Sequence, residues 1–394
     1  MSRSRSGFAA AVAAVALSLV FTSTALATTW SGDRALTKSG GGYAYRGGLA
    51  VTGRTTVHAV FEQSTSNGFR AFYRRSGDSG THWDVPIELS RPDVGDAGVP
   101  AIDAAGSQVD AVWVEGDDIF SGLDSVVSYR RSTDGGLTWQ APIQISSTLG
   151  RAGFPRVLHA GPGRVLVTWT DHVSKQILSR LSTNGGASFG SIVALGTTTD
   201  RPLNNGSLYD GMPTPALGSG VIYVAYYVTG HSLRIRRSID GGVHWGTATT
   251  LATNGSGQDI TVAAYGSIVL VGYSVPTSTD DYTVLRRSTD KGAHWAAPAY
   301  LSPKTAYRSF APVITYHAGA FRAAFERCTT STCSRSATYY RASSTGLTWG
   351  TTTAVSLRKR TYDYPVDIDV AGRIVVLYDD VNASSGDVYV RQGS

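Results

Sequence analysis

Residues 130–139 read Arg-Arg-Ser-Thr-Asp-Gly-Gly-Leu-Thr-Trp, and the pattern Arg-Arg-Ser-x-Asp-x-Gly-x-x-Trp returns along the chain. Complete copies occupy residues 74–83, 130–139, 236–245 and 286–295. Residues 180–189 form a weaker copy with Asn184 and Phe189 in the Asp and Trp places, and residues 341–349 form a decayed one. The aromatic ends lie at positions 83, 139, 189, 245, 295 and 349, which are 56, 50, 56, 50 and 54 residues apart. A period of this size indicates a propeller or another repeat array.

The N-terminus has the features of a secretion signal. Arg3 and Arg5 precede an apolar run over residues 8–20, and Ala25-Leu26-Ala27 offers a cleavage site of small residues. We expect residues 1–27 to be a signal peptide and residues 28–394 to be a single propeller domain, secreted from the cell. No later run is long and apolar enough to predict a membrane span.

Charge excludes one class of partner. The formal charge of +6 falls to +4 without Arg3 and Arg5, and no basic run is longer than Arg358-Lys359-Arg360. Nucleic-acid binding needs a concentrated basic patch, so we expect no nucleic-acid partner. We expect a monomer whose partner is a glycan or another polar polymer.

Each repeat predicts four short antiparallel strands. Residues 99–104, 109–114, 126–131 and 137–145 alternate with turn residues, which is the pattern of one propeller blade. We find no helical period. Seven second strands carry an aromatic residue near their end, so we predict an all-β, seven-bladed propeller; the residues are Phe61, Trp113, Trp169, Tyr226, Tyr273, Phe325 and Tyr378.

The two ends of the mature chain predict how the ring closes. Residues 388–391 read like a third strand, and Thr29-Trp30 followed by Leu36 resembles Thr138-Trp139 followed by Ile145. We expect the N-terminal segment to supply the fourth strand of the last blade, which removes free sheet edges.

The repeated motif resembles the Asp box, Ser-x-Asp-x-Gly-x-x-Trp, of sialidases and their relatives. The Ser and Asp side chains suit hydrogen bonds to nearby backbone N–H groups, and Gly suits a left-handed turn. The resemblance implies that the boxes are structural and lie away from the binding face. We assign this structural role to Asp78, Asp134, Asp240, Asp290, Trp83, Trp139, Trp245 and Trp295. We expect the paired arginines before the boxes to be solvated or paired on an outer strand.

Cys328 and Cys333 enclose four residues of a polar loop. In an exported chain this spacing favours a disulfide that pins the loop.

Acidic residues gather where second strands end. Glu62, Glu115, Asp171, Glu326 and Asp379 each lie within two residues of the second-strand aromatic. They are either solvated strand ends or an acidic ring at the channel mouth that binds a polar ligand or a cation, with Ca²⁺ as the candidate cation. No cofactor is otherwise indicated.

The connections between blades add further candidates for ligand binding. Long loops on a rigid scaffold are often functional, and exposed Tyr beside Asp and Arg suits a glycan. We name Glu62, Glu115, Asp171, Asp210, Tyr307, Tyr362 and Asp363 as candidate ligand-binding residues.

The resemblance to sialidases also implies a catalytic pattern. That family uses three arginines that grip a carboxylate, a Tyr–Glu pair and an acidic acid/base, an exception to the two-carboxylate scheme of glycoside hydrolysis. Here the candidates are Arg151, Arg201 and Arg308 for the arginines, Glu326 and Tyr364 for the pair, and Asp379. The chain departs from the family in its seven blades and in lacking an early Phe/Tyr-Arg-Ile/Leu-Pro segment. We therefore expect a secreted carbohydrate-binding propeller, with a sialidase-like glycoside hydrolase as the alternative and a protein-docking propeller as a third reading.

Overall fold

The structure is a computed structural model that describes residues 28–37, 43–117, 125–147, 151–197, 212–228, 232–256, 259–276, 281–302, 307–356, 362–381 and 386–394. These residues form strands, turns and bends, and no helix occurs among them. Accordingly, the described part of the chain holds no helix that could cross a membrane.

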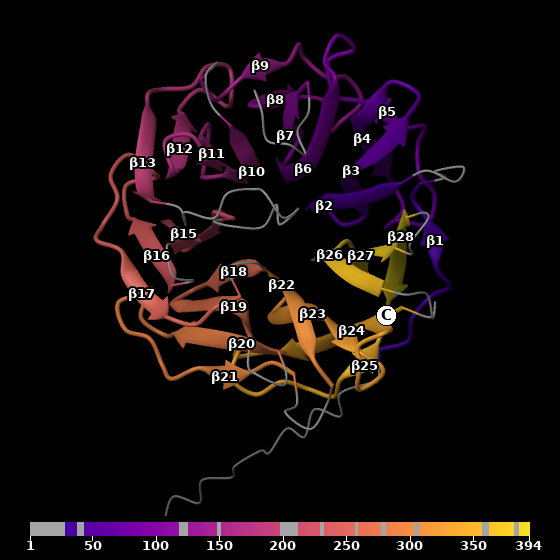
Figure 1. Cartoon of the computed structure of the whole chain (residues 1–394), viewed down its shortest axis with the longest axis vertical. Helices are drawn as coiled ribbons and strands as arrows, with labels where there is room; N and C mark the ends of the chain where they lie inside the picture. Colours follow the sequence, from indigo (N-terminus) through magenta and orange to yellow (C-terminus); the bar gives the residue numbers. More distant parts are fainter. Residues whose placement is uncertain are drawn as a thin grey trace, which may run out of the picture.

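Seven four-stranded antiparallel sheets stand around a central axis (Figure 1). The innermost strands are β2 (Ala44–Thr52), β6 (Asp96–Ala105), β10 (Ala152–His159), β14 (Thr214–Gly218), β18 (Ile260–Tyr265), β22 (Ser309–His317) and β26 (Tyr362–Val370). The second strands are β3 (Thr56–Thr65), β7 (Gln108–Gly116), β11 (Val165–Asp171), β15 (Val221–Val228), β19 (Ile268–Pro276), β23 (Ala320–Cys328) and β27 (Ile374–Val381). The third strands are β4 (Gly68–Ser76), β8 (Val126–Ser132), β12 (Gln176–Ser182), β16 (Ser232–Ser238), β20 (Asp281–Ser288), β24 (Ser336–Ser343) and β28 (Gly386–Gly393). The outer strands are β5 (Ile87–Glu88), β9 (Ile143–Gln144), β13 (Ile192–Thr197), β17 (Thr249–Ala252), β21 (Ala299–Tyr300), β25 (Thr353–Ala354) and β1 (Arg34–Ala35).

We number the blades in chain order, from blade 1 (β2–β5) to blade 7 (β26–β28 with β1). The predicted fold class of seven antiparallel blades is confirmed. The seven second-strand aromatics are all buried, at 2% exposure or less. They lie in clusters that combine residues of adjacent blades, such as Trp169 of blade 3 with Val112 of blade 2. Apolar burial between neighbouring sheets is therefore what holds the ring together laterally.

The predicted closure is also confirmed, because β1 is the outer strand of blade 7 and pairs with β28 (Figure 1). Arg34 lies opposite Val390, and the Leu36 amide donates to the Val388 carbonyl at 2.8 Å. Trp30 forms a bridge with Gly393 and packs edge-on against Tyr340 of blade 6. The N-terminal segment thus completes the last blade.

The repeated motif forms a tight turn between the third and outer strands. In the copy at 130–139, the Ser132 hydroxyl donates to Asp134 at 2.7 Å, and the Gly136 amide donates to the Ser132 hydroxyl at 2.8 Å. Asp134 accepts the amide protons of Leu137 and Thr138, and the Thr138 hydroxyl bond leads the effects that hold the pKa of Asp134 below its usual range. The same Ser–Asp and Gly–Ser bonds recur in the copies that begin at Arg74, Arg236 and Arg286.

The motif glycine fits against the preceding blade. Gly136 has a φ of 86°, and a Cβ there would lie 1.8 Å from the Tyr73 hydroxyl of blade 1. The motif Trp139 packs edge-on against the same Tyr73 ring, with centroids 4.9 Å apart. The turn therefore needs glycine for two reasons, a left-handed backbone and a close neighbour.

In five copies of the motif, the first arginine donates to a backbone carbonyl at the outer strand of the blade before. Arg74 donates to the Asp84 carbonyl in its own blade and to the Leu36 carbonyl of blade 7, both at 2.7 Å. The corresponding bonds to the preceding blade are Arg130 to Leu89, Arg180 to Ile145, Arg286 to Leu251 and Arg341 to Leu301.

The residue at the second position of the pair donates a hydrogen bond to the motif turn of the following blade. Arg75 donates to the Gly135 carbonyl at 3.1 Å. The corresponding bonds are Arg131 to Gly185, Arg237 to Lys291, Arg287 to Thr345 and, across the closure, Gln392 to Ser79. The expectation that these arginines are solvated or paired on an outer strand is therefore wrong in the main: apart from the exposed Arg237, they are half-buried and bound chiefly to backbone carbonyls between blades. We call these contacts of both positions the interblade clasps.

Removal of one clasp should destabilise the ring. Arg131→Met keeps much of the side-chain volume but removes the charged donor to the half-buried Gly185 carbonyl, which then retains only Gln108 Nε2 at 3.0 Å. We therefore expect a loss of about 1–2 kcal/mol in the free energy of unfolding. Urea denaturation followed by tryptophan fluorescence measures it. Arg234→Met, at an exposed position of β16, is the matched control and should change stability by less than about 0.5 kcal/mol. Equal effects of the two substitutions would contradict the clasp.

Candidate functional site

The ring has two unlike faces. The hairpins that join first to second strands lie on one face of the ring. Because second strands run away from that face and third strands run back to it, the motif turns that follow the third strands lie there too. The other face carries the loops that join second to third strands and the connections between blades. We call it the loop face, and the candidate site residues that the structure describes belong to it or to the strand ends beneath it.

The acidic residues at the second-strand ends are not solvated. Glu62, Glu115, Asp171, Glu326 and Asp379 are exposed by 6% or less. A buried carboxylate needs hydrogen-bond donors, and for Glu62, Glu115 and Asp171 these come from inside the protein.

Glu62 supports a bulge in the next blade. The inner strand β6 shifts register between Gly98 and Ala101, and Val99 has a left-handed φ of 52° just before Pro100. The bulge takes the Val99 amide out of the ladder, and Glu62 of blade 1 accepts its proton at 2.6 Å. The carboxylate therefore stabilises a strained backbone where β6 approaches the loop face.

Similar strain recurs around the channel. Phe154 and Ala311 also precede prolines and have φ values of 48° and 47°, and Asp259 has a φ of 57°. Asp259 of blade 5 accepts the Ala311 amide proton of blade 6 at 3.2 Å, as Glu62 does for Val99. Burial raises the pKa of Asp259 to about 6, against the opposing effect of hydrogen bonds from Ala311 and Ser274.

Glu115 and Asp171 bind other internal donors. Glu115 accepts from Trp113 Nε1 at 2.7 Å, from the Ser128 hydroxyl at 2.5 Å and from Arg91 Nε at 2.5 Å. Asp171 accepts the amide protons of Val173 and Ser174, both at 2.9 Å, and so caps the turn after β11. Whether any of these acids also contacts a ligand stays a prediction.

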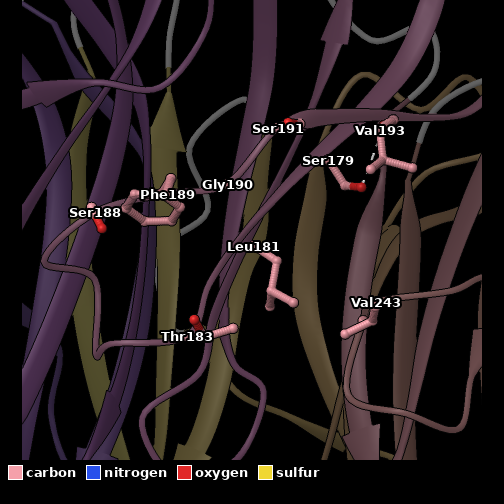
Figure 2. A pocket seen from close by; sticks show the side chains of 10 residues that line it. Ser179, Leu181, Thr183, Ser188, Phe189, Gly190, Ser191, Val193 and Val243 are labelled. Carbon is pink, nitrogen blue, oxygen red and sulfur yellow. Dashed lines mark hydrogen bonds between the residues drawn. The ribbon is translucent and has the colours of Figure 1, made fainter.

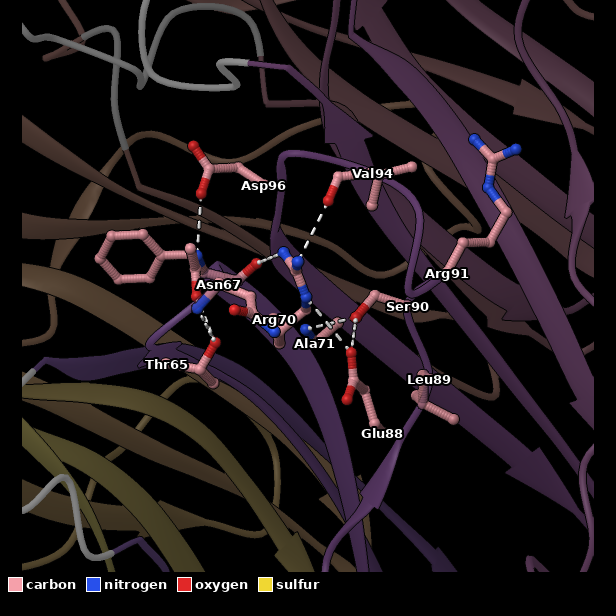
Figure 3. Close-up of polar contacts among 12 residues, drawn as sticks. Thr65, Asn67, Arg70, Ala71, Glu88, Leu89, Ser90, Arg91, Val94 and Asp96 are labelled. Carbon is pink, nitrogen blue, oxygen red and sulfur yellow. Dashed lines mark hydrogen bonds and ion pairs between the residues drawn. The ribbon is translucent and has the colours of Figure 1, made fainter.

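One connection on the loop face is held rigidly by Arg70, which sequence reasoning missed (Figure 3). Arg70 is buried and donates to the carbonyls of Val94 and Gly95 at 3.1 and 2.8 Å. It also pairs with Glu88 at 3.3 Å, and Asp96 accepts the Phe69 amide proton at 2.8 Å. The connection from blade 1 to blade 2 is thus fixed by internal contacts, so its exposed groups are presented on a rigid support.

Arg308 and Tyr307 lie at the start of blade 6. Arg308 pairs with Asp281 of blade 5 and packs over the Phe310 ring at 5.3 Å, yet its side chain stays 42% exposed. Tyr307 is 49% exposed. Arg151, half-buried, accepts the His172 amide proton through its carbonyl at 2.9 Å.

The predicted disulfide Cys328–Cys333 is confirmed. The Cys328 amide donates to the Arg308 carbonyl at 2.8 Å, so the pinned loop is tied to the connection that enters blade 6.

The remaining candidates lie at or beyond the edge of what is described. Tyr362, Asp363 and Tyr364 belong to β26, but their side chains are outside the described part of the chain. Arg201 and Asp210 fall in residues 198–211, which are also outside it. The proposed arginine triad and the Tyr–Glu pair therefore stay predictions.

A second set of titratable groups, half-buried on the inner strands, belongs to no sequence motif. Asp367 of β26 accepts the Leu49 amide proton of β2 at 2.8 Å, and Asp103 of β6 accepts that of His159 in β10 at 2.7 Å. His159 contacts the buried Asp110 at 2.5 Å, and this contact outweighs burial, so the pKa of His159 is raised. These carboxylates join inner strands of neighbouring blades. No group of three or more metal-ligating side chains occurs among the described residues, and the calcium expectation stays untested.

Comparison with known proteins shows the fold. No protein-family model and no curated protein matches the sequence. A protein of unknown function from Dyadobacter fermentans DSM 18053 is similar in structure, with a TM-score of 0.54, 13% identity, and coverage of 93% of this chain and 99% of that one.

Sialidases are also structural neighbours. Trypanosoma rangeli sialidase has a TM-score of 0.51 and 14% identity over 78% of this chain, and a Hadza microbial sialidase has 0.51 and 12% over 89%. This chain spans 56% and 65% of those two proteins. At such identities the likeness concerns the propeller scaffold alone.

The bulge contact predicts a stability effect. Glu62→Leu removes the acceptor of the Val99 amide, so we expect a loss of about 1–3 kcal/mol in the free energy of unfolding. Glu62→Gln keeps an acceptor oxygen and should lose less. Urea denaturation at neutral pH measures both, and two variants as stable as the wild type would show that the bulge does not depend on Glu62.

Asp367 predicts a pH dependence. Burial raises its pKa to about 7 in the folded protein, although the Leu49 and Ile368 amides favour the ionised form. In the unfolded chain an aspartate ionises near pH 4. The Asp367 contribution to stability therefore falls as the pH rises from about 4 to about 7. Asp367→Asn should gain in melting temperature relative to the wild type across that window, whereas the exposed Asp93→Asn should not. A wild-type-minus-variant difference that is flat with pH would contradict the shifted pKa.

Proposed function

We propose that this chain is an exported propeller of the Asp-box group that binds carbohydrate through its loop face. The repeated turns support the group assignment. Their Ser, Asp and Gly residues make the bonds that the motif predicts, and they lie on the face opposite the loops.

The internal contacts of Glu62 and Glu115 favour binding over hydrolysis, and this observation carries the proposal. A hydrolase needs two carboxyl groups, or a Tyr–Glu pair, that reach the substrate. Here Glu62 accepts a hydrogen bond from a backbone amide inside the protein. Glu115 accepts hydrogen bonds from an indole, a hydroxyl and a guanidinium. These contacts hold the backbone at the channel mouth in place, and the carboxylate oxygens that make them are bound to protein groups rather than to a substrate.

The exposed groups of the loop face have the chemistry of a glycan surface. Tyr307 offers a half-exposed ring for stacking against a sugar, and Arg308 and Arg91 offer partly exposed guanidinium donors. Arg308 is oriented by Asp281 and Phe310, so little side-chain freedom is lost when a ligand binds. One of the similar structures is Trypanosoma rangeli sialidase in complex with sialic acid, an acidic sugar. An acidic sugar would suit the two arginines.

A sialidase-like hydrolase stays the second candidate because of where the repeat puts Glu326. Its register in blade 6, opposite Phe310 and Thr338, corresponds to that of Glu62 in blade 1, opposite Tyr45 and Ala71. In the following blade the residue before the inner-strand proline is Val99 for Glu62 and Tyr364 for Glu326. By analogy with Glu62 and Val99, we expect Glu326 and Tyr364 to approach one another from adjacent blades.

A glycan array together with fluorogenic sialoside and glycoside substrates tests the proposal on the mature protein. We expect binding without turnover, and we expect Tyr307→Ala to weaken binding by roughly tenfold or more, since a stacking ring contributes over 1 kcal/mol. Tyr300→Ala, a similarly exposed tyrosine on outer strand β21, is the control. Absence of binding to any glycan would contradict the proposal.

The same assay decides between the two candidates. Turnover that Glu326→Gln abolishes would establish the hydrolase, and turnover unchanged by that substitution would remove Glu326 from the catalytic set. Turnover of either kind would replace binding as the primary function.

A further inference from the structure

A groove of about 400 Å³ lies on the outer side of the ring between blades 3 and 4 (Figure 2). Third strand β12 contributes Ser179 and Leu181, the motif end of blade 3 contributes Phe189 and Ser191, and the motif turn of blade 4 contributes Val243. The loop-face candidates Tyr307 and Arg308 belong to a different blade, blade 6.

At the groove, blade 3 lacks two side chains that are present in blade 2. In blade 2, Arg131 bonds the Gln140 side chain at 2.8 Å and the Gly185 carbonyl of the next turn. Blade 3 has Leu181 in the place of Arg131 and Gly190 in the place of Gln140. The guanidinium and the amide that fill this space in blade 2 are therefore both absent from blade 3.

The fold compensates for the lost arginine from another strand. Arg164, in the hairpin before β11, donates to the Gly241 carbonyl at 3.1 Å. Gly241 is the counterpart of Gly185, so the motif turn of blade 4 is still gripped. The groove can remain open without leaving that carbonyl unsatisfied.

The lining combines an apolar wall with hydroxyl groups. Leu181, Phe189 and Val243 supply the wall, and four hydroxyl side chains surround it: Ser179, Thr183, Ser188 and Ser191. None of the ten lining residues carries a charge. An apolar face with an aromatic ring suits the C–H face of a sugar, hydroxyls can donate and accept, and a lining without charge favours a neutral ligand. The volume is at the lower end of the range for small-molecule sites.

We propose that this groove binds one neutral pyranose ring, with its C–H face against Phe189 and Leu181 and its hydroxyls toward the serines. The site is separate from the loop face and does not rest on the function proposed for that face.

The repeat itself supplies the test variants. Gly190→Gln restores the side chain of blade 2 at a position where the nearest atom to an added Cβ is the Leu181 carbonyl oxygen at 3.4 Å, so the backbone can accept it. Gly350→Gln is the matched control in blade 6, where the nearest atom is the Ala342 carbonyl oxygen, also at 3.4 Å. Leu181→Arg fills the groove from the other side.

Saturation-transfer NMR with methyl α-D-glucopyranoside and methyl β-D-galactopyranoside provides the readout. We expect the wild type and Gly350→Gln to bind at least one of them with a millimolar Kd, and Gly190→Gln and Leu181→Arg to bind about tenfold more weakly or not at all. N-acetylneuraminic acid is the charged comparison and should not compete at the groove.

Two results would overturn the inference. One is the absence of saturation transfer from either glycoside to the wild type. The other is glycoside binding that Gly190→Gln leaves unchanged. If Tyr307→Ala abolishes that binding, the sugar occupies the loop face alone. If the protein binds no glycan on the array but still binds a glycoside in the groove, only the function proposed for the loop face is contradicted.

Discussion

Arginine side chains that donate to backbone carbonyls of neighbouring blades fix how the blades are set against one another. A propeller blade buries its faces against two neighbours, but burial alone is non-directional and does not fix how one blade is set against the next. The interblade clasps supply that direction: Arg74 and Arg130 tie outer strands together, and Arg75 and Arg131 hold the following turn. A guanidinium has several donors in a planar fork, so one side chain can serve two blades at once.

The same demand for satisfied backbone groups explains the acids at the channel mouth. Bulges in the inner strands free amide protons that the ladder cannot use, and carboxylates of the preceding blade accept them, as Glu62 does for Val99 and Asp259 for Ala311. The acids therefore belong to the scaffold first. A rigid mouth lined by strained backbone then presents groups such as Tyr307 and Arg308 in fixed positions, which suits recognition more than it suits acid–base chemistry.

The sequence predicts much of this because the repeat is regular. The period, the second-strand aromatics and the resemblance of residues 29–36 to 138–145 are enough to predict seven blades and their closure, and the spacing of Cys328 and Cys333 predicts the disulfide. The roles of the acids and arginines are not predictable in this way. In the sequence, a carboxylate at a strand end looks the same whether its side chain faces water or accepts an amide proton from the next blade. Glu62 does the latter, and its partner amide lies 37 residues later. Likewise, Arg164 is recognisable as a substitute for the missing arginine of blade 3 only once the Gly241 carbonyl is seen beside it.

The central claim is that the interblade clasps, together with the β1–β28 pair that closes blade 7, make the ring one cooperative unit. A chain that begins at residue 38, compared with one that begins at residue 28, tests it most directly, because it lacks β1, the Leu36 carbonyl that Arg74 binds and the Ser31 carbonyl that Arg391 binds. Differential scanning calorimetry should show the single transition of the wild type shifted to a lower temperature by well over 5 °C or lost, since a whole edge and its clasps disappear. An unchanged melting temperature would contradict the account.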